Sequence, residues 1–169
     1  MKIAIMGYSG SGKSYLTHYF SQKYNIPAME LDAVAFDKNW HRLDDADVLP
    51  KVRRFMEQES WILDGNYDSL LLDQRLKTAD SIIIVKLPRL QCLWRALRRS
   101  KERAKQGYTN DINPRFLRFL LLDCRSRERQ MFYRNIEKTY QNKTVVLRSQ
   151  SQIDRYIGSI ELSKRPAVS

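Results

Sequence analysis

The sequence predicts an α/β fold with a five-stranded parallel sheet covered by helices. Short apolar runs alternate with amphipathic helical patterns, and a glycine-rich loop follows the first apolar run. The runs are continuous and rich in β-branched residues, which is typical of parallel strands buried on both faces. The length of 169 residues suits one domain.

Strands are predicted at five places, of which Ile82–Val85 lies in the clearest apolar run. The five predicted strands are 2–6, 27–31, 61–63, 81–87 and 144–147. The predicted helices are 13–24, 44–58, 88–105, 114–140 (with room for one break) and 150–162. We expect one domain over 1–162, with an insertion at about 32–58, a helical lid at about 95–130 and a loose tail at 163–169.

The basic excess of the chain is confined to one segment. The whole sequence carries 30 Lys and Arg against 19 Asp and Glu, a net charge of +11. Residues 86–149 hold 17 of the basic and 5 of the acidic residues, a net charge of +12, and have leucines between the charges. This pattern predicts folded helices with one positive side rather than a basic tail. No apolar run approaches the length of a membrane span, so we expect a soluble, cytoplasmic protein.

Cysteine and histidine are too sparse to suggest a metal centre. Cys92 and Cys124 are the two cysteines, and neither lies in a CxxC or Cys/His pattern. We expect two free, buried thiols in a reducing compartment and no zinc site.

The strongest motif is Gly7–Ser14, which matches G-x-x-x-x-G-K-[ST] between a predicted strand and a predicted helix. Glycines let successive backbone N–H groups point at phosphate oxygens, and the helix start adds its positive dipole end. The expected nucleotide-binding residues are Gly7, Ser9, Gly10, Ser11, Gly12, Lys13 and Ser14. We expect Lys13 to reach the β- and γ-phosphates of ATP and Ser14 to coordinate Mg²⁺. The alternative is a glycine- and serine-rich turn that matches by chance.

A second metal ligand is expected at Asp64. It ends the predicted strand 61–63 and precedes Gly65, so it would lie beside the loop at the carboxyl edge of the sheet. The alternative is that Asp64 only begins a turn, as Asp-Gly pairs often do. The neighbouring strand ends at Lys86 and offers no rival acid.

The order of these motifs resembles the nucleoside monophosphate kinase superfamily, and more closely the adenylate-kinase-related family of DNA topology modulation (FlaR-related) proteins. The motifs that carry the resemblance run from Gly7–Ser14 through Leu31-Asp32, 36–40, 61–67, Arg75, 79–83 and 87–89 to 92–95. The resemblance covers roughly residues 1–105. It implies a three-layer P-loop NTPase fold with a helical lid, ATP and Mg²⁺ as cofactors, and phosphoryl transfer. This chain has Lys86 where the family often has an acid, which leaves Asp64 as the acid for the metal.

Four residues are expected on the acceptor side. Asp32 follows the second strand and is the candidate acceptor ligand or general base, with a helix N-cap as the alternative. Trp40 could stack on the acceptor or pack in the core, as could Phe36. Asn66 follows the turn after Asp64, and Arg75 could reach an acceptor phosphate.

Arginine rows predict the lid. Arg95, Arg99 and Arg103 recur at i, i+4 and i+8, on a face distinct from the apolar stripe Leu90, Leu93, Trp94 and Leu97. The next helix is expected to carry Arg115, Arg118, Arg125 and Arg129 on one face. Such rows can neutralise triphosphate, with Arg95 and Arg99 as catalytic candidates, although a solvated helix surface is the common alternative. The resemblance to the nucleoside monophosphate kinase superfamily implies that the loop Arg148-Ser149-Gln150, after the last strand, holds adenine, which makes Arg148 the candidate adenine contact.

Two functions remain open at this stage. One is an ATP- and Mg²⁺-dependent phosphotransferase acting on a nucleoside, a nucleotide or another small hydroxyl compound. The other is an ATP-dependent nucleic-acid-binding regulator of DNA topology or a polynucleotide-end kinase, which would use the basic segment 86–149. The sequence leaves the acceptor and the oligomeric state undetermined.

Overall fold

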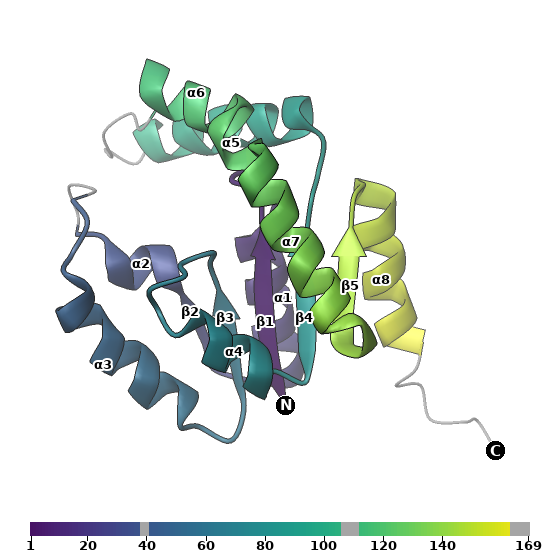
Figure 1. Cartoon of the computed structure of the whole chain (residues 1–169). Coiled ribbons are helices and arrows are strands. Elements are labelled where there is room, and N and C mark those ends of the chain that lie inside the picture. The colour runs from purple at the N-terminus through teal and green to yellow at the C-terminus, as the bar shows by residue number, and fades with distance from the viewer. Residues whose placement is uncertain (38–40, 106–111, 163–169) are drawn as a thin grey trace.

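The computed structural model describes residues 1–37, 41–105 and 112–162 (Figure 1). Its strands form one five-stranded sheet in the order β2-β3-β1-β4-β5, and every neighbouring pair is parallel. The strands are β1 (Lys2–Gly7), β2 (Ala28–Glu30), β3 (Trp61–Asp64), β4 (Ser81–Val85) and β5 (Thr144–Leu147). The helices are α1 (Lys13–Tyr24), α2 (Leu31–Ala35), α3 (Asp45–Met56), α4 (Leu72–Thr78), α5 (Arg89–Lys105), α6 (Pro114–Leu121), α7 (Arg127–Thr139) and α8 (Gln150–Leu162). The predicted three-layer α/β fold with a parallel sheet is confirmed.

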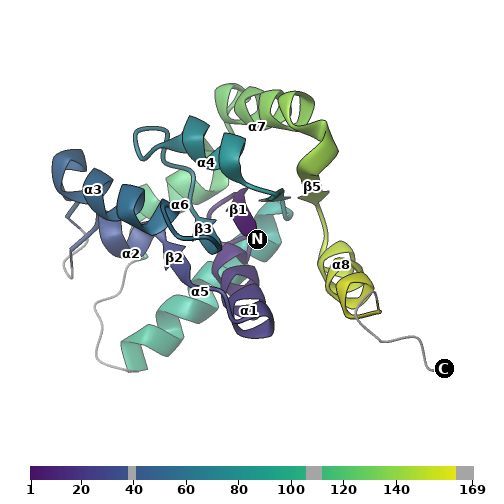
Figure 2. The same cartoon turned by 90° about the horizontal axis from the view of Figure 1, so that it is seen from below.

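Helices cover both faces of the sheet and its carboxyl edge. Figure 2 shows α1 and α8 on one face and α4 and α7 on the other. Figure 1 shows α5 and α6 lying across the carboxyl ends of the strands, with α2 and α3 beside the β2 edge. The loops that follow β1, β2 and β3 therefore open toward the same space under α5 and α6, which is where ligands bind in open parallel sheets.

The sheet forms the centre of the core. In β4, Ile82–Val85 are at most 1% exposed, and Trp61, Ile62 and Leu63 of β3 are fully buried. Burial on both faces explains why these segments are continuously apolar in sequence. All five predicted strands are present, and the ends of each differ from the prediction by at most two residues.

The predicted helix 114–140 is interrupted. It separates into α6, a 3₁₀ turn at Asp123–Arg125 and α7. The Ser126 hydroxyl accepts a hydrogen bond of 3.2 Å from the Arg129 N–H and caps the new helix start. The break means that Arg115, Arg118, Arg125 and Arg129 do not share one face, so this part of the lid prediction was wrong. The sequence analysis also missed α2 and α4, which are short helices of 5 and 7 residues.

The buried face of α5 differs from the predicted one. Of the predicted apolar stripe, Leu90, Trp94 and Leu97 are 77%, 61% and 45% exposed, whereas Leu93 is half-buried and packs against the core. The residues that face inward are instead Cys92, Ala96 and Ser100, which are small and recur at i, i+4 and i+8. The reason is close backbone packing: a Cβ atom at Gly10 would lie 2.6 Å from the Cys92 carbonyl oxygen, which leaves no room for leucine or tryptophan at this contact.

None of the described helices combines the length and the apolar character that a bilayer crossing requires.

Candidate functional site

The Gly7–Ser14 loop connects β1 to α1 at the carboxyl edge of the sheet. It folds back on itself through a 3.2 Å hydrogen bond from the Ser11 N–H to the Tyr8 carbonyl, and the Lys13 ammonium group lies 3.3 Å from the same carbonyl. Helix α1 begins at Lys13, and no side chain caps the helix start at Gly12. Uncapped N–H groups at a helix start, with an ammonium group beside them, form a cradle suited to phosphate oxygens.

Two glycines allow α5 to approach the loop closely. Gly10 has φ +71° and packs against the backbone of Cys92, and Gly12 has φ +95° and packs against the Arg95 guanidinium. Both conformations are in the left-handed region that residues with a Cβ atom rarely adopt. The motif glycines therefore shape the loop and also its contact with the helix above it.

Arg95 links three separate segments. One guanidinium nitrogen donates a 2.9 Å hydrogen bond to the Ser11 carbonyl, and the other donates to the side chain of Gln150 at the start of α8. Arg95 is thus half-buried against the outside of the loop and does not line the cavity described below. Its observed contacts hold the loop in place rather than reach into the site.

Ser14 and Asp64 lie together, as the sequence analysis predicted, and a third residue joins them. The Ser14 hydroxyl donates a 2.7 Å hydrogen bond to Glu30 and lies 3.4 Å from Asp64 Oδ2. Glu30 ends β2, and the sequence analysis did not identify it. Its position before Leu31-Asp32, at the end of a predicted strand, was the available signal.

Asp64 is buried (5% exposed), and its Oδ1 atom has no hydrogen-bond partner within the described part of the chain. Burial raises the pKa of Asp64 to about 6, the negative charges of Glu30 and Asp32 add to this, and Lys13 opposes it. An unsatisfied buried carboxylate is costly unless a cation or a donor meets it.

The oxygen atoms at this point fit a Mg²⁺ ion. Ser14 Oγ, Asp64 Oδ1 and the neighbouring carboxylate of Glu30 are hard ligands of the kind Mg²⁺ prefers. Across residues 1–37, 41–105 and 112–162, no group of three or more His, Cys, Asp or Glu side chains is placed so that it could hold a metal ion. A Mg²⁺ ion at Ser14 and Asp64 would therefore need further ligands from phosphate and water.

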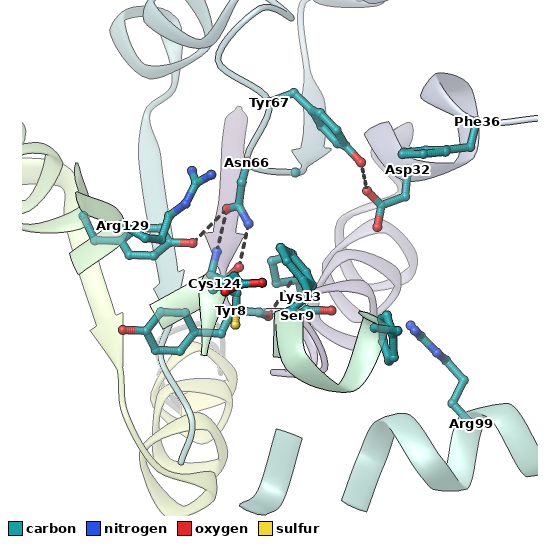
Figure 3. Close-up of a pocket in the computed structure, with 16 residues that line it drawn as sticks. Tyr8, Ser9, Lys13, Asp32, Phe36, Asn66, Tyr67, Arg99, Cys124 and Arg129 are labelled. Carbon is teal, nitrogen blue, oxygen red and sulfur yellow. Dashed lines mark hydrogen bonds between the residues drawn. The ribbon is translucent and has the colours of Figure 1, made fainter. Parts of the chain in front are cut away.

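A cavity of about 440 Å³ opens in front of the loop (Figure 3). It is lined by the loop, α2, the segment after β3, and residues of α5, α6 and α7. The lining residues are Gly7, Tyr8, Ser9, Lys13, Asp32, Phe36, Gly65, Asn66, Tyr67, Arg99, Phe116, Phe119, Asp123, Cys124, Arg129 and Tyr133. The predicted residues Lys13, Asp32, Asn66 and Arg99 therefore meet in one cavity.

Asp32 and Tyr67 face each other on one wall. The Tyr67 hydroxyl donates a hydrogen bond to Asp32 Oδ1, and Figure 3 shows the two side chains meeting at the edge of the cavity. Burial raises the pKa of Tyr67, and the adjacent Asp32 carboxylate raises it further, so Tyr67 stays a donor. This contact fixes the Asp32 carboxylate and leaves its second oxygen toward the cavity.

Asn66 and Arg75 support the site in ways that the sequence analysis did not predict. The Asn66 amide exchanges two hydrogen bonds with the backbone of Gly7, at 3.1 and 2.7 Å, and joins the segment after β3 to the loop. Arg75 is 1% exposed, and its guanidinium donates to the carbonyls of Gly65 and Tyr67 at 3.0 and 2.6 Å. Burial lowers the pKa of Arg75 to about 10. The expected contact of Arg75 with an acceptor phosphate is therefore wrong, because its side chain is occupied beneath the cavity.

Residues of the predicted lid reach the cavity from two helices. Arg99 of α5 and Arg129 of α7 both line it, and Figure 3 shows them on opposite sides. Arg125 lies beside the cavity instead, with its guanidinium 4.1 Å from the Tyr8 ring and 2.8 Å from the Leu87 carbonyl. Trp40 and the side chain of Arg103 lie outside the described residues.

Arg148 and Lys86 are both engaged by Glu137 of α7. Lys86 at the end of β4 pairs with Glu137, and the Arg148 guanidinium lies 3.5 Å from the other oxygen of the same carboxylate. Lys86 therefore lies away from the Ser14–Asp64 pair. Arg148 has about half of its side chain exposed and does not line the cavity, and its expected contact with adenine stays a prediction.

Both cysteines are free and buried, as predicted. Cys124 also lines the cavity, and Cys92 lies 3.2 Å from the Arg125 guanidinium. No sequence pattern predicts that either cysteine lies beside the loop.

One solved structure of similar fold supports the α/β architecture, and a second is given beside it. The crystal structure of TT1252 from Thermus thermophilus superposes with a TM-score of 0.51 at 19% sequence identity, over 98% of both chains. The crystal structure of an uncharacterized protein from Eubacterium ventriosum ATCC 27560 gives a TM-score of 0.49 at 12% identity, over 98% of this chain and 100% of the other. No protein-family model and no curated protein sequence matches the chain. At these identities, the similarity to TT1252 establishes that this chain shares its α/β fold over nearly its whole length.

Proposed function

We propose that this chain is an ATP-dependent, Mg²⁺-requiring phosphotransferase of the adenylate-kinase-like class that acts on a nucleoside, a nucleotide or another small hydroxyl acceptor. The observation that carries the proposal is one cavity with Lys13 on one side and Asp32 on another. A nucleotide cradle and an acid for the acceptor hydroxyl are the two parts that phosphoryl transfer needs.

In this proposal ATP lies with its phosphates over the Gly7–Ser14 loop. Lys13 and the N–H groups at the start of α1 bind the β- and γ-phosphate oxygens. Ser14 and Asp64, with Glu30 beside them, would hold Mg²⁺, which neutralises phosphate charge when bound. Arg99 and Arg129 meet negative charge that builds up on the transferring phosphoryl group.

We also propose that the chain is related to the family that its motifs resemble. The confirmed fold and the meeting of Lys13, Ser14 and Asp64 at one edge of the sheet support kinship with adenylate-kinase-related topology modulation proteins.

The experiment is a screen of ATP consumption with nucleosides, nucleotides, small metabolites and oligonucleotides. Lys13→Ala is expected to abolish consumption because it removes the ammonium group from the phosphate cradle. Lys138→Ala is the matched control, since Lys138 is exposed on α7 and away from the loop. If the wild-type protein consumed no ATP with any compound and bound none, the proposal would fail.

The second candidate function is nucleic-acid binding gated by ATP. It is favoured by the exposed arginines of α5–α7 and by Trp94, which is 61% exposed with the Arg98 guanidinium 5.7 Å from its ring centroid. Exposed arginines of these helices are Arg89, Arg98, Arg99, Arg115, Arg118, Arg127 and Arg134. Binding through such a surface should weaken steeply between low and moderate salt. ATP turnover that appears only with oligonucleotides would favour this candidate over the first.

A further inference from the structure

Aromatic side chains from two separate parts of the fold line the cavity. Phe36 and Tyr67 come from the end of α2 and the segment after β3, and their ring centroids are 6.4 Å apart. Phe116 and Phe119 come from α6. Phe119 remains 45% exposed, so packing within the chain does not account for its ring. Aromatic rings that line a cavity wall offer stacking surfaces for a flat ligand.

The wall beside Tyr67 carries negative charge. Asp32 is exposed there, with one oxygen held by the Tyr67 hydroxyl. Two described cations near this wall, Arg42 and Arg75, are held by contacts with other protein groups. Arg42 stacks 4.9 Å from the Tyr67 ring centroid and pairs with Asp45 at 2.7 Å, and Arg75 is buried on two backbone carbonyls. Neither Arg42 nor Arg75 lines the cavity. A phosphate on the acceptor would meet a carboxylate here.

The described cations that do line the cavity are Lys13, Arg99 and Arg129. Lys13 belongs to the loop, and the two arginines come from α5 and α7, so none of them comes from α2 or from the segment after β3. The cavity therefore has phosphate-binding character along the loop and the lid helices, and aromatic and acidic character beside Asp32.

We propose that the acceptor is an uncharged compound with a flat ring and a free hydroxyl group, of the nucleoside class. Its ring lies against the aromatic side chains of α2 and α6, and its hydroxyl lies at the second carboxylate oxygen of Asp32, the one that Tyr67 does not hold. This inference rests on the phosphotransferase proposal and narrows it, because a nucleotide acceptor is no longer included.

Phosphoryl transfer to this acceptor requires only ATP, the acceptor hydroxyl and the Asp32 carboxylate. The acceptor hydroxyl oxygen forms a bond to the γ-phosphorus of ATP, and the bond from that phosphorus to the β,γ-bridging oxygen breaks. The electron pair of the broken bond stays on ADP, and the hydroxyl proton passes to the Asp32 carboxylate. Tyr67 holds that carboxylate in place through its hydrogen bond.

The test measures kcat/KM for ADP formation with Mg²⁺ and ATP and three acceptor sets: common nucleosides, their 5′-monophosphates, and ribose as a hydroxyl compound without a flat ring. Nucleosides are expected to exceed monophosphates by about tenfold or more, because of the unfavourable contact of phosphate with Asp32. They are expected to exceed ribose by about fivefold or more, because of stacking.

Two variants test whether Phe119 and Asp32 contribute to the use of nucleosides. Phe119→Leu should raise KM for nucleosides by about fivefold or more with unchanged Mg·ATP affinity. Met131→Leu, at an exposed apolar residue of α7 that does not line the cavity, is the control and should leave KM unchanged. Asp32→Asn should lower kcat by about a hundredfold while Mg·ATP binding is retained.

The outcomes separate this inference from the phosphotransferase proposal. Preferred turnover of monophosphates, or equal turnover of ribose, would overturn the inference and leave the phosphotransferase proposal standing. Turnover with none of the three acceptor sets, although Mg·ATP binds, would also overturn it. Absence of both Mg·ATP binding and ATP consumption would refute the phosphotransferase proposal itself.

Discussion

Asp64 Oδ2 lies 3.4 Å from the Ser14 hydroxyl, although the two residues are 50 positions apart in the sequence. The contact exists because β1 and β3 are adjacent and parallel, so the end of β3 lies beside the loop that follows β1. It places a buried carboxylate, with one oxygen unsatisfied in the described structure, where a cation bound to phosphate would lie.

Replacing Asp64 should stabilise the ligand-free protein at neutral pH. Burial raises the pKa of Asp64 from 3.8 to about 6, so its ionisation costs folding free energy. For an acid whose pKa is raised in the folded state, the favourable contribution is complete below about pH 4 and is lost as the pH rises through 6. Asp64→Asn should therefore increase the unfolding free energy by about 3 kcal/mol above pH 7 and by little below pH 4.

Denaturant unfolding at pH 4, 6 and 8 measures this difference, with the exposed Asp73→Asn on α4 as the control. The same Asp64 variant should lose Mg²⁺-dependent ATP binding. A stability gain that is equal at pH 4 and pH 8 would contradict the assignment of the effect to ionisation.

Adding a methyl group at Gly10 should destabilise the protein. The new Cβ atom would lie 2.6 Å from the Cys92 carbonyl oxygen, and the φ of +71° is unfavourable for alanine. Gly10→Ala is expected to cost about 1–3 kcal/mol in a thermal unfolding experiment. Gly158→Ala is the matched control, since Gly158 lies within α8 with no atom within 4 Å of its added Cβ, and it should stabilise by about 0.5–1 kcal/mol. Equal effects of the two changes would be inconsistent with close packing of α5 on the loop.

Arg75→Met should act on stability rather than on acceptor choice. The substitution removes the guanidinium that donates hydrogen bonds to the Gly65 and Tyr67 carbonyls in a buried region. The expected loss of unfolding free energy is about 1–3 kcal/mol. The exposed Arg54→Met on α3 should have almost no effect. Urea unfolding gives the stability, and KM values for several acceptors give the selectivity. A variant of unchanged stability that lost turnover of phosphorylated acceptors alone would restore the acceptor role for Arg75.

Arg99→Ala should lower ATP turnover by about tenfold or more with little change in unfolding temperature, because Arg99 lines the cavity and is exposed in the ligand-free protein. Arg98→Ala is its neighbour control, since Arg98 pairs with Glu102 at the surface. Steady-state kinetics of the two variants test whether Arg99 contributes to ATP turnover. Similar turnover rates for Arg99→Ala and Arg98→Ala would remove Arg99 from the mechanism.

The sheet and the loop could be predicted from the sequence because their determinants are local. The continuous apolar run Ile82–Val85 and the motif Gly7–Ser14 each carry their own signal within a few residues. Asp64 could be placed because it ends one of those strands. The meeting of these segments then follows from the parallel strand order.

The orientation of α5 could not be predicted from its own sequence, because the surface against which it packs decides which of its faces is buried. An apolar stripe at helical spacing indicates the buried face only when the partner surface accepts large side chains, and here the Gly10 backbone admits Cys92 and Ala96 instead. The burial of Arg75 and the position of Glu30 beside Ser14 depend in the same way on contacts between distant segments.

Calorimetric titration of Mg·ATP into wild-type protein and Lys13→Ala tests most directly the claim that the Gly7–Ser14 loop binds nucleotide phosphates. The expected result is saturable binding by the wild-type protein, a loss of affinity of about tenfold or more in Lys13→Ala, and no loss in Lys138→Ala. Equal binding by the wild-type protein and Lys13→Ala, or no binding by either, would contradict the claim.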